Sequence, residues 1–235
     1  MDGDPLRGYL CGQKKTAGKE ITMRIFLVRH GETAMNQAKA YYGAMDVPLN
    51  DNGWSQAKML GECLQGVDFD GFYISSRLRA QQTASVIVPE GNLKWHVIEG
   101  LDEMNFGQWE GLNYHQVQER YPKEWDAWCR DWLHAAPSGG ETFSHFFKRV
   151  WDAFEEIMEQ AKNARCENIL ICAHNGTLRV ILAVMCGLGE EGTWHFNFEQ
   201  DGYSLVEEQW EHFTVRKMNC KDKVGLESWN IQKKH

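Results

Sequence analysis

The sequence predicts an α/β fold in which parallel strands are joined by helical crossovers. Beyond Met23, short apolar runs alternate with longer segments of helical period, as is typical of such strands and their connections. Two of the apolar runs, 25–28 and 169–173, lead into His30 and His174. At 235 residues the chain is also long enough to bury a full core as one large domain.

The expected strands are short runs rich in apolar residues. Four of them suit the interior of a parallel sheet, and two later ones indicate a more amphipathic, hairpin-like finish. They are 24–29, 70–75, 95–99 and 168–173, followed by 203–208 and 212–218.

The expected helices lie between these strands. Asn50 is placed to cap the first and Ser76 the second, while Ser138 or the turn at 139–140 is placed to begin the fourth. The predicted ranges are 51–65, 77–88, 114–133, 141–163 and 176–186.

Aromatic residues crowd the region around the third predicted helix. We expect most of them to pack in the core or in a lid, and the alternative is that some line a pocket and stack on a flat ring of the substrate. The set is Trp109, Tyr114, Tyr121, Trp125, Trp128 and Trp132.

The bulk composition argues against several classes of protein. Lys and Arg number 25 against 33 Asp and Glu, and no block of like charges occurs, so a nucleic-acid tract is not expected. The apolar runs fall far short of the roughly 20 residues that a membrane span needs. Seven cysteines without zinc-finger spacing indicate reduced thiols, and none of them is expected to act as a nucleophile. The chain is expected to be cytoplasmic.

The first candidate site is Arg29-His30-Gly31, directly behind an apolar run. An arginine presents fixed donors that suit phosphate oxygens, and a neutral imidazole beside it can attack phosphorus or accept a proton. This pairing indicates phosphoryl chemistry, against the simpler alternative of a strand that ends in a polar turn.

The second candidate repeats the pattern, because the strand 168–173 leads into His174, Asn175 and Gly176. In a parallel sheet both histidines emerge at the carboxyl edge, where ligands of open α/β sheets bind, and the following helix points its positive end at an anion. The alternative is that His174 only satisfies a hydrogen bond in the core.

Other segments supply the remaining groups. An arginine in the first turn of the helix after the second strand lies against the helix dipole, so an anion that it must reach explains it better than the helix does. Arg77 and Arg79 are the two candidates, with a surface arginine as the alternative. A carboxylate in the segment 101–111 can protonate a leaving group, but spacing does not choose among Asp102, Glu103 and Glu110.

Taken together, these residues resemble the histidine phosphatase superfamily, which includes cofactor-dependent phosphoglycerate mutases and many small-molecule phosphatases. The resemblance runs from about Met23 to Asn219. It implies a phosphoglycerate mutase-like α/β/α sandwich of three layers with a mostly parallel central sheet. Its motifs are Arg29-His30-Gly31-Glu32-Thr33 with Asn36; Ser76, Leu78, Arg79, Ala80, Gln82, Thr83 and Ala84; Glu103 with Gly107, Trp109, Glu110 and Gly111; and His174 before Gly176.

The resemblance also implies the role of each site residue. His30 would be the nucleophile that forms a phosphohistidine, and Glu103 would be the proton donor and then the base for water. Arg29, Arg79 and His174 would clamp the phosphoryl group, and Thr33 and Asn36 would contact it as well. No metal and no cofactor are implied. Many relatives carry glycine where this chain has Asn175, whose side chain would offer a donor in its place.

Within the superfamily, the segments 128–137, 140–150 and 194–196 are similar to α-ribazole phosphatases of cobalamin synthesis. The implied substrate is α-ribazole 5′-phosphate, a small-molecule phosphate ester. A broad-specificity phosphatase, a phosphoglycerate mutase and a catalytically silent protein that binds phosphorylated ligands are the alternatives. The chain lacks the longer inserted cap that such mutases tend to show, which favours hydrolysis.

The expected organisation has one folded unit. Residues 1–22 show no periodicity, and we expect a disordered extension there, either natural or added for expression. The histidine phosphatase domain is expected over 23–220 with a helical cap around 105–140, and 221–235 as a C-terminal tail. A monomer and a homodimer are both compatible with the sequence.

Overall fold

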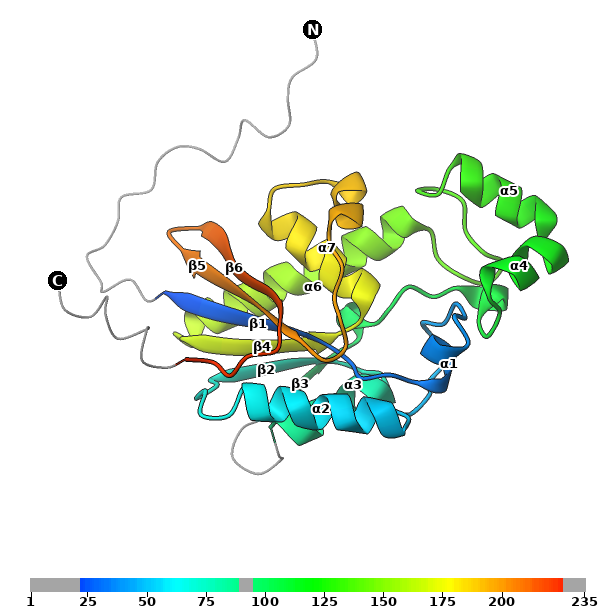
Figure 1. Cartoon of the computed structure of the whole chain (residues 1–235). Helices are drawn as coiled ribbons and strands as arrows, with labels where there is room; N and C mark the ends of the chain where they lie inside the picture. Colours follow the sequence, from blue (N-terminus) through cyan, green and yellow to red (C-terminus); the bar gives the residue numbers. More distant parts are fainter. Residues whose placement is uncertain (1–21, 89–94, 226–235) are drawn as a thin grey trace, which may run out of the picture.

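A central six-stranded sheet organises the chain, as the computed structural model shows for the residues it describes, 22–88 and 95–225 (Figure 1). The strand order is β3-β2-β4-β1-β5-β6. Neighbours among β1, β2, β3 and β4 are parallel, whereas β5 runs antiparallel to β1 and β6 to β5. The predicted α/β fold with a mostly parallel sheet is therefore confirmed. The strands are β1 (Met23–Arg29), β2 (Gly71–Ser75), β3 (Trp95–Ile98), β4 (Asn168–Ala173), β5 (Tyr203–Gln209) and β6 (His212–Cys220).

Helices cover both faces of the sheet, which gives three layers (Figure 1). The amphipathic α6 and the apolar α7 pack on one face, in a core that includes Ile25 and Ile169. On the other face α2 and α3 pack over Phe26 and Leu170. Alternation along β1 and β4 sends successive side chains to opposite cores. The helices are α1 (Ala34–Gln37), α2 (Asp51–Cys63), α3 (Leu78–Ile87), α4 (Tyr114–Arg120), α5 (Pro122–Arg130), α6 (Phe143–Asn163) and α7 (Asn175–Met185), with short 3₁₀ turns at Glu99–Leu101, Gly107–Trp109 and Glu190–His195.

The third predicted helix, 114–133, is wrong as a single element. The structure has two helices there, α4 and α5, which break at Tyr121. Pro122 has no N–H to continue α4, but it suits the first position of a new helix, which is where it lies. Figure 1 shows α4 and α5, together with α1, on the side of the sheet at which β1 ends.

Two of the predicted caps are also wrong. Asn50 caps α2 as expected, since its side chain accepts the N–H of Gly53. The residue before α3 is Arg77, and the hydroxyl of Ser76 instead donates to Asp102. Helix α6 is capped by Thr142, which accepts the N–H of His145, so neither Ser138 nor the glycine turn begins it.

The aromatic residues before and within α4 and α5 pack largely against one another. Trp109 is fully buried, its ring lies 6.0 Å from Trp125 and 5.5 Å from Trp128, and its indole N–H donates to Glu124. Tyr41 contacts the same indole at 5.8 Å. These contacts attach the segment carrying α4 and α5 to the loop after α1.

None of the helices in residues 22–88 and 95–225 is both long and apolar enough to cross a bilayer. The six cysteines in these ranges are free thiols.

Candidate active site

The parallel register of β1 and β4 brings His30 and His174 together. Arg29 pairs with Ala173, so the next residue of each strand is a histidine at the same carboxyl edge. The backbone N–H of His30 donates to the carbonyl of Ala173 at 2.9 Å. The centroids of the two imidazole rings lie 5.0 Å apart, and both side chains are buried.

His30 has a fixed tautomer. Its Nδ1 lies 2.7 Å from the carbonyl oxygen of Gly31, and because a carbonyl only accepts, Nδ1 carries the proton. Nε2 therefore keeps its lone pair. Burial, followed by the positive charges of Arg79 and Arg29, holds the pKa of His30 well below its usual 6.5. The ring is neutral at physiological pH and can act as a nucleophile.

Arg79 is held on three sides. Its Nη1 and Nη2 donate to the carbonyls of Met45 and Gly43 at 2.9 and 3.0 Å, and its Nε donates to Nδ1 of His174 at 3.2 Å. The guanidinium also lies 4.6 Å from the ring centroid of Tyr42. Because Arg79 is fully buried and these contacts fix its rotamer, the position of its positive charge is set before a ligand binds.

Arg29 ends β1 beside His30 and anchors a second loop. Its Nη1 donates to the carbonyl of Phe198 at 2.8 Å. Its Nε is buried and has no hydrogen-bond partner among the described residues. A buried guanidinium donor without a partner is costly, and an anionic oxygen would satisfy it.

The three candidate carboxylates have different surroundings. Glu110 accepts the backbone N–H groups of Gly43, Ala44 and Met45, so it shapes the loop whose carbonyls hold Arg79. Asp102 accepts from the side chains of two serines and Arg77 and is buried. Glu103 is left as the candidate proton donor.

Glu103 lies at the N-terminus of α7. Its Oε2 accepts the N–H of Gly176 at 2.9 Å, and its Oε1 accepts the N–H of Met104 at 3.0 Å. A Cβ built on Gly176 would lie 2.4 Å from Oε1, so the close approach needs glycine there. The charge of Glu103 acts on the half-buried Arg29 and on the buried Arg79. The carboxyl group thus lies among the cations of the site.

Thr33 and Asn36 form a polar cluster with Tyr42 next to His30. Thr33 Oγ1 lies 2.9 Å from the hydroxyl of Tyr42, which donates to Asn36 Oδ1 at 2.8 Å. Gln200 Nε2 donates to the same Asn36 oxygen at 3.0 Å. Burial raises the pKa of Tyr42, which keeps the phenol protonated as a donor.

Asn175 is the first residue of α7, and its Oδ1 accepts the backbone N–H of Phe198 at 3.1 Å. The backbone carbonyl of Phe198 accepts a hydrogen bond from Arg29. Asn175 therefore braces the loop that holds Arg29.

Sequence reasoning missed two residues that touch the site. Tyr42 gave no signal, because it lies in a loop without a motif. Ser75 ends the strand β2 next to β4, at the same carboxyl edge as the histidines, so its place could have been found by the rule that picked out His30 and His174. Arg77, the other candidate arginine beside Arg79, forms a 2.8 Å ion pair with Asp102.

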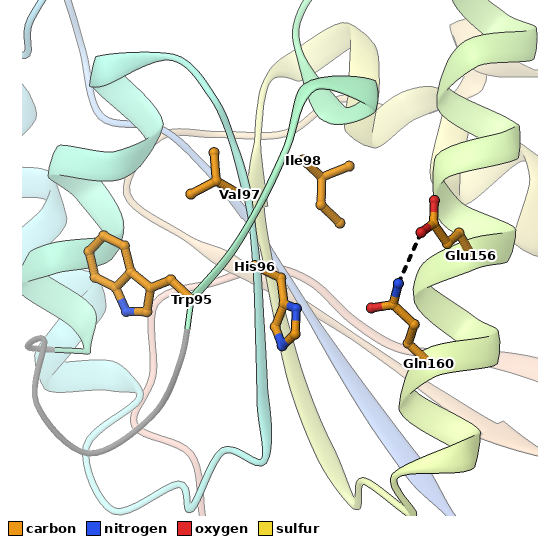
Figure 2. Close-up of a pocket in the computed structure, with 6 residues that line it drawn as sticks. All are labelled: Trp95, His96, Val97, Ile98, Glu156 and Gln160. Atoms are coloured by element: carbon orange, nitrogen blue, oxygen red, sulfur yellow. Dashed lines mark hydrogen bonds between the residues drawn. The ribbon is translucent and has the colours of Figure 1, made fainter.

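A pocket lies apart from this site, between β3 and α6 (Figure 2). None of the predicted site residues lines it. Gln160 donates to Glu156 across one turn of α6 at 3.0 Å, and the His96 ring stacks on Tyr73 at 5.2 Å. The lining residues are Trp95, His96, Val97, Ile98, Glu156 and Gln160. Across residues 22–88 and 95–225, no group of three or more His, Cys, Asp or Glu side chains is arranged to hold a metal ion.

Comparison with known families decides what this arrangement is. The model of the histidine phosphatase superfamily (branch 1) matches residues 25–221. The chain belongs to this superfamily. The resemblance seen in its four motifs is therefore confirmed. The phosphatases of this family use a histidine nucleophile, and the chain is accordingly an enzyme of the phosphatase type.

Named relatives fall within the same superfamily. The adenosylcobalamin/alpha-ribazole phosphatase of Escherichia coli (strain K12) is 35% identical over 206 residues, which cover 88% of this chain and 100% of that protein. A 2,3-bisphosphoglycerate-dependent phosphoglycerate mutase of Cytophaga hutchinsonii is 30% identical over 187 residues, 78% of this chain and 86% of the mutase. The crystal structure of the alpha-ribazole phosphatase from Shigella flexneri superposes with a TM-score of 0.81 at 34% identity, covering 86% of this chain and 99% of that one. The phosphoglycerate mutase-like architecture is thereby confirmed.

Proposed function

We propose that the chain is a metal-independent phosphomonoester hydrolase that works through a phosphohistidine at His30. The observation that carries the proposal is the neutral, buried His30, whose Nδ1 proton is held by Gly31 and whose Nε2 lone pair remains. Two displacements at one imidazole split a very slow hydrolysis into two easier steps, and side chains supply every group that these steps need.

The residues divide the work. Arg29, Arg79 and His174 hold the phosphoryl oxygens, and fixed charges stabilise the transition state best because they need no reorganisation. Glu103 protonates the leaving oxygen and then takes a proton from the water that attacks the phosphohistidine. Thr33, Asn36 and Asn175 complete the binding of the substrate.

The proposed substrate is α-ribazole 5′-phosphate in the cobalamin pathway. Relatives at 35% identity bear the name adenosylcobalamin/alpha-ribazole phosphatase. The aromatic surface also favours a phosphate ester that carries a flat ring: Trp194 is 58% exposed, packs edge-on to Trp132 at 5.4 Å, and lies under the guanidinium of Arg179 on α7.

A panel of phosphate monoesters ranked by kcat/KM tests the substrate. We expect α-ribazole 5′-phosphate to stand at least tenfold above sugar phosphates, phosphoserine and 3-phosphoglycerate. Equal rates across the panel would point to a broad-specificity phosphatase. Isomerisation of 3-phosphoglycerate without release of phosphate, in the presence of the bisphosphate, would point to a mutase.

His30→Ala tests the nucleophile, with His96→Ala in the separate pocket as the matched control. We expect His30→Ala to lose turnover of 4-nitrophenyl phosphate by a factor of about 10³ or more, since no phosphohistidine can form without the imidazole. Rapid quenching in alkaline detergent with a substrate labelled on phosphorus should trap a phosphoprotein that is stable to alkali and labile to acid, in the parent and in His96→Ala but not in His30→Ala. Equal turnover in His30→Ala and the parent would remove His30 as nucleophile, and no turnover in the parent would favour a silent phospho-ligand binding protein.

We propose 23–220 as the catalytic domain, with the helical cap around 105–140 and a C-terminal tail over 221–235. Residues 1–21 and 226–235 lie outside the described residues. The proposal also includes a cytoplasmic location, a small-molecule substrate, and no nucleic-acid or membrane partner. It is compatible with a homodimer.

A further inference from the structure

A chain of hydrogen bonds runs from Arg79 through His174 to Asp102. Arg79 Nε donates to Nδ1 of His174 at 3.2 Å. On the other side of the ring, Nε2 lies 2.7 Å from Oγ of Ser75, and this hydroxyl lies 2.7 Å from Oδ1 of Asp102. His174, Ser75 and Asp102 are all buried, so these bonds have no competition from solvent.

The donors and acceptors along this chain fix the protons. The Asp102 carboxylate only accepts, so the single hydroxyl proton of Ser75 goes to Oδ1. Ser75 Oγ then accepts, and it receives the backbone N–H of Arg77 at 3.2 Å. Its remaining lone pair faces Nε2 of His174, which must therefore carry a proton. Nδ1 of His174 accepts from Arg79, so the neutral ring has its proton on Nε2.

The two histidines of the site thus carry opposite tautomers. His30 holds its proton on Nδ1, against the Gly31 carbonyl, and keeps Nε2 bare. His174 holds its proton on Nε2, against Ser75, and keeps Nδ1 bare.

We propose that Ser75 and Asp102 are positioning residues that keep the proton of His174 on Nε2, so that Nδ1 can take a proton from a bound phosphate ester. This rests on the proposed phosphatase function. When the ester arrives as a monoanion, its P–O–H proton moves to Nδ1, which leaves a phosphoryl dianion and a doubly protonated ring. Nδ1 then donates to the phosphoryl group, and Arg79 Nε no longer donates to the ring and is available to the same oxygens.

The surroundings of His174 explain why such support is needed. Burial and the charges of Arg79, Arg29 and Arg77 keep the pKa of His174 well below its usual 6.5, and His30 adds to this effect. Glu103, which accepts from Gly176, is the acidic group on the α7 side. Asp102, acting through Ser75, is the negative charge connected by hydrogen bonds to the ring itself, and it favours the imidazolium once the dianion is present.

Ser76 provides a matched control. It is the next residue in the chain, and its hydroxyl donates to the other oxygen of the same carboxylate, Asp102 Oδ2, at 2.7 Å. The structure gives it no hydrogen bond to His174. Arg77 also pairs with that oxygen, at 2.8 Å, so the oxygen keeps a cationic partner that does not depend on the Ser76 hydroxyl. Ser76→Ala thus alters the surroundings of the Asp102 carboxylate but leaves the hydrogen bonds from Asp102 through Ser75 to His174 in place.

Nitrogen NMR of histidine-labelled protein without substrate tests the tautomers independently of any activity. We expect His30 to be protonated on Nδ1 and His174 on Nε2, with the signals assigned from His30→Ala and His174→Gln. Ser75→Ala should let His174 exchange between tautomers, whereas Ser76→Ala should leave it on Nε2. A parent protein with His174 protonated on Nδ1, or an unchanged tautomer in Ser75→Ala, would overturn the proposal even if the enzyme is a phosphatase.

The pH profile of kcat provides the second readout, on 4-nitrophenyl phosphate. Losing the hydrogen bond to Asp102 lowers the pKa of His174 in the complex, so the basic limb of the Ser75→Ala profile should move to lower pH. We also expect a roughly tenfold or larger loss of kcat at neutral pH, by analogy with the residues that orient metal-ligating histidines. Ser76→Ala should keep the parent limb, and thermal melting checks that both variants are folded. If the basic limbs of the Ser75→Ala and parent profiles coincide, the proposal is overturned. If no phosphohistidine can be trapped in the parent protein, the proposed function is overturned instead.

Discussion

At the scale of single residues, Glu103 allows proton donation to the leaving group to be tested apart from phosphate binding. Its carboxyl group is held by the N–H groups of Gly176 and Met104, beside the cations that bind phosphate. A general acid matters in proportion to the basicity of the group that leaves. The leaving group therefore becomes a probe of this one side chain.

Glu103→Gln should slow alkyl phosphate esters far more than 4-nitrophenyl phosphate. We expect a loss of about 10² to 10⁴ in kcat/KM for an alkyl ester, whose alkoxide needs a proton, and a much smaller loss for the nitrophenolate, which leaves without one. The comparison uses kcat/KM because this ratio reports the transfer of the phosphoryl group to His30, and hydrolysis of the phosphohistidine, for which Glu103 is also the proposed base, is common to both esters. Steady-state rates on the two esters measure the ratio. Glu156→Gln, in the pocket of Figure 2, should change neither rate. Equal losses on both esters would assign Glu103 to binding.

The same segment shows how far residue-level prediction can go. The sequence placed three carboxylates after the third strand but could not choose among them, because the choice depends on donors that come from elsewhere in the chain. Glu110 is occupied by the N–H groups of 43–45, and Asp102 by Ser75, Ser76 and Arg77. Spacing along the sequence carries no record of such partners.

At the scale of elements, predictions held where a local rule decided the outcome. The strands leading into His30 and His174 were found because a buried strand of a parallel sheet is a continuous apolar run. The break between α4 and α5 was missed although Pro122 was visible, because the residues on both sides of it were assigned to one helix. The cap of α3 was missed because Asp102, on a distant segment, takes the hydroxyl of Ser76.

The start of α7 offers a test in which activity and stability move apart. Gly176→Ala adds a methyl group that meets Glu103 Oε1 at 2.4 Å, so the carboxyl group must shift away from its place. The backbone itself gains, since alanine in a helix is favoured over glycine by about 1 kcal/mol. We expect a loss of kcat of at least tenfold with little or no fall in the melting temperature, measured by steady-state kinetics and thermal unfolding.

Gly189→Ala is the control for this substitution. No heavy atom lies within 4 Å of the Cβ that it would add, and its φ of −80° is open to any residue. It should leave kcat and melting temperature near those of the parent. A Gly176→Ala protein with parent kinetics would show that Glu103 does not need its present position.

At the scale of the whole molecule, the sheet concentrates buried titratable groups at one edge. The chain as a whole carries a formal charge of −8, yet Arg29 and Arg79 converge with two histidines at the ends of β1 and β4. The local potential is therefore positive in an acidic protein, and this potential decides which small anions bind. Folding this edge has a cost that depends on pH.

His30 and His174 make the free energy of unfolding fall below pH 6.5. The pKa of each is held well below 6.5 in the folded protein by burial and by Arg79, whereas the unfolded chain titrates near that value. Between pH 6.5 and the lowered folded pKa, the unfolded state binds more protons, so stability is lost as the pH falls. Two such groups give a slope of at most about 2.7 kcal/mol per pH unit.

Urea unfolding at several pH values between 7.5 and 5.5 measures this slope. His30→Ala should roughly halve it, because one of the two groups that resist protonation is gone, and the variant should gain on the parent as the pH falls. His212→Gln, on the exposed strand β6, should keep the full slope. A parent protein whose stability stays flat from pH 7.5 to 5.5 would mean that the two imidazoles accept protons as readily folded as unfolded, and the bare Nε2 assigned to His30 could not persist at the lower end of that range.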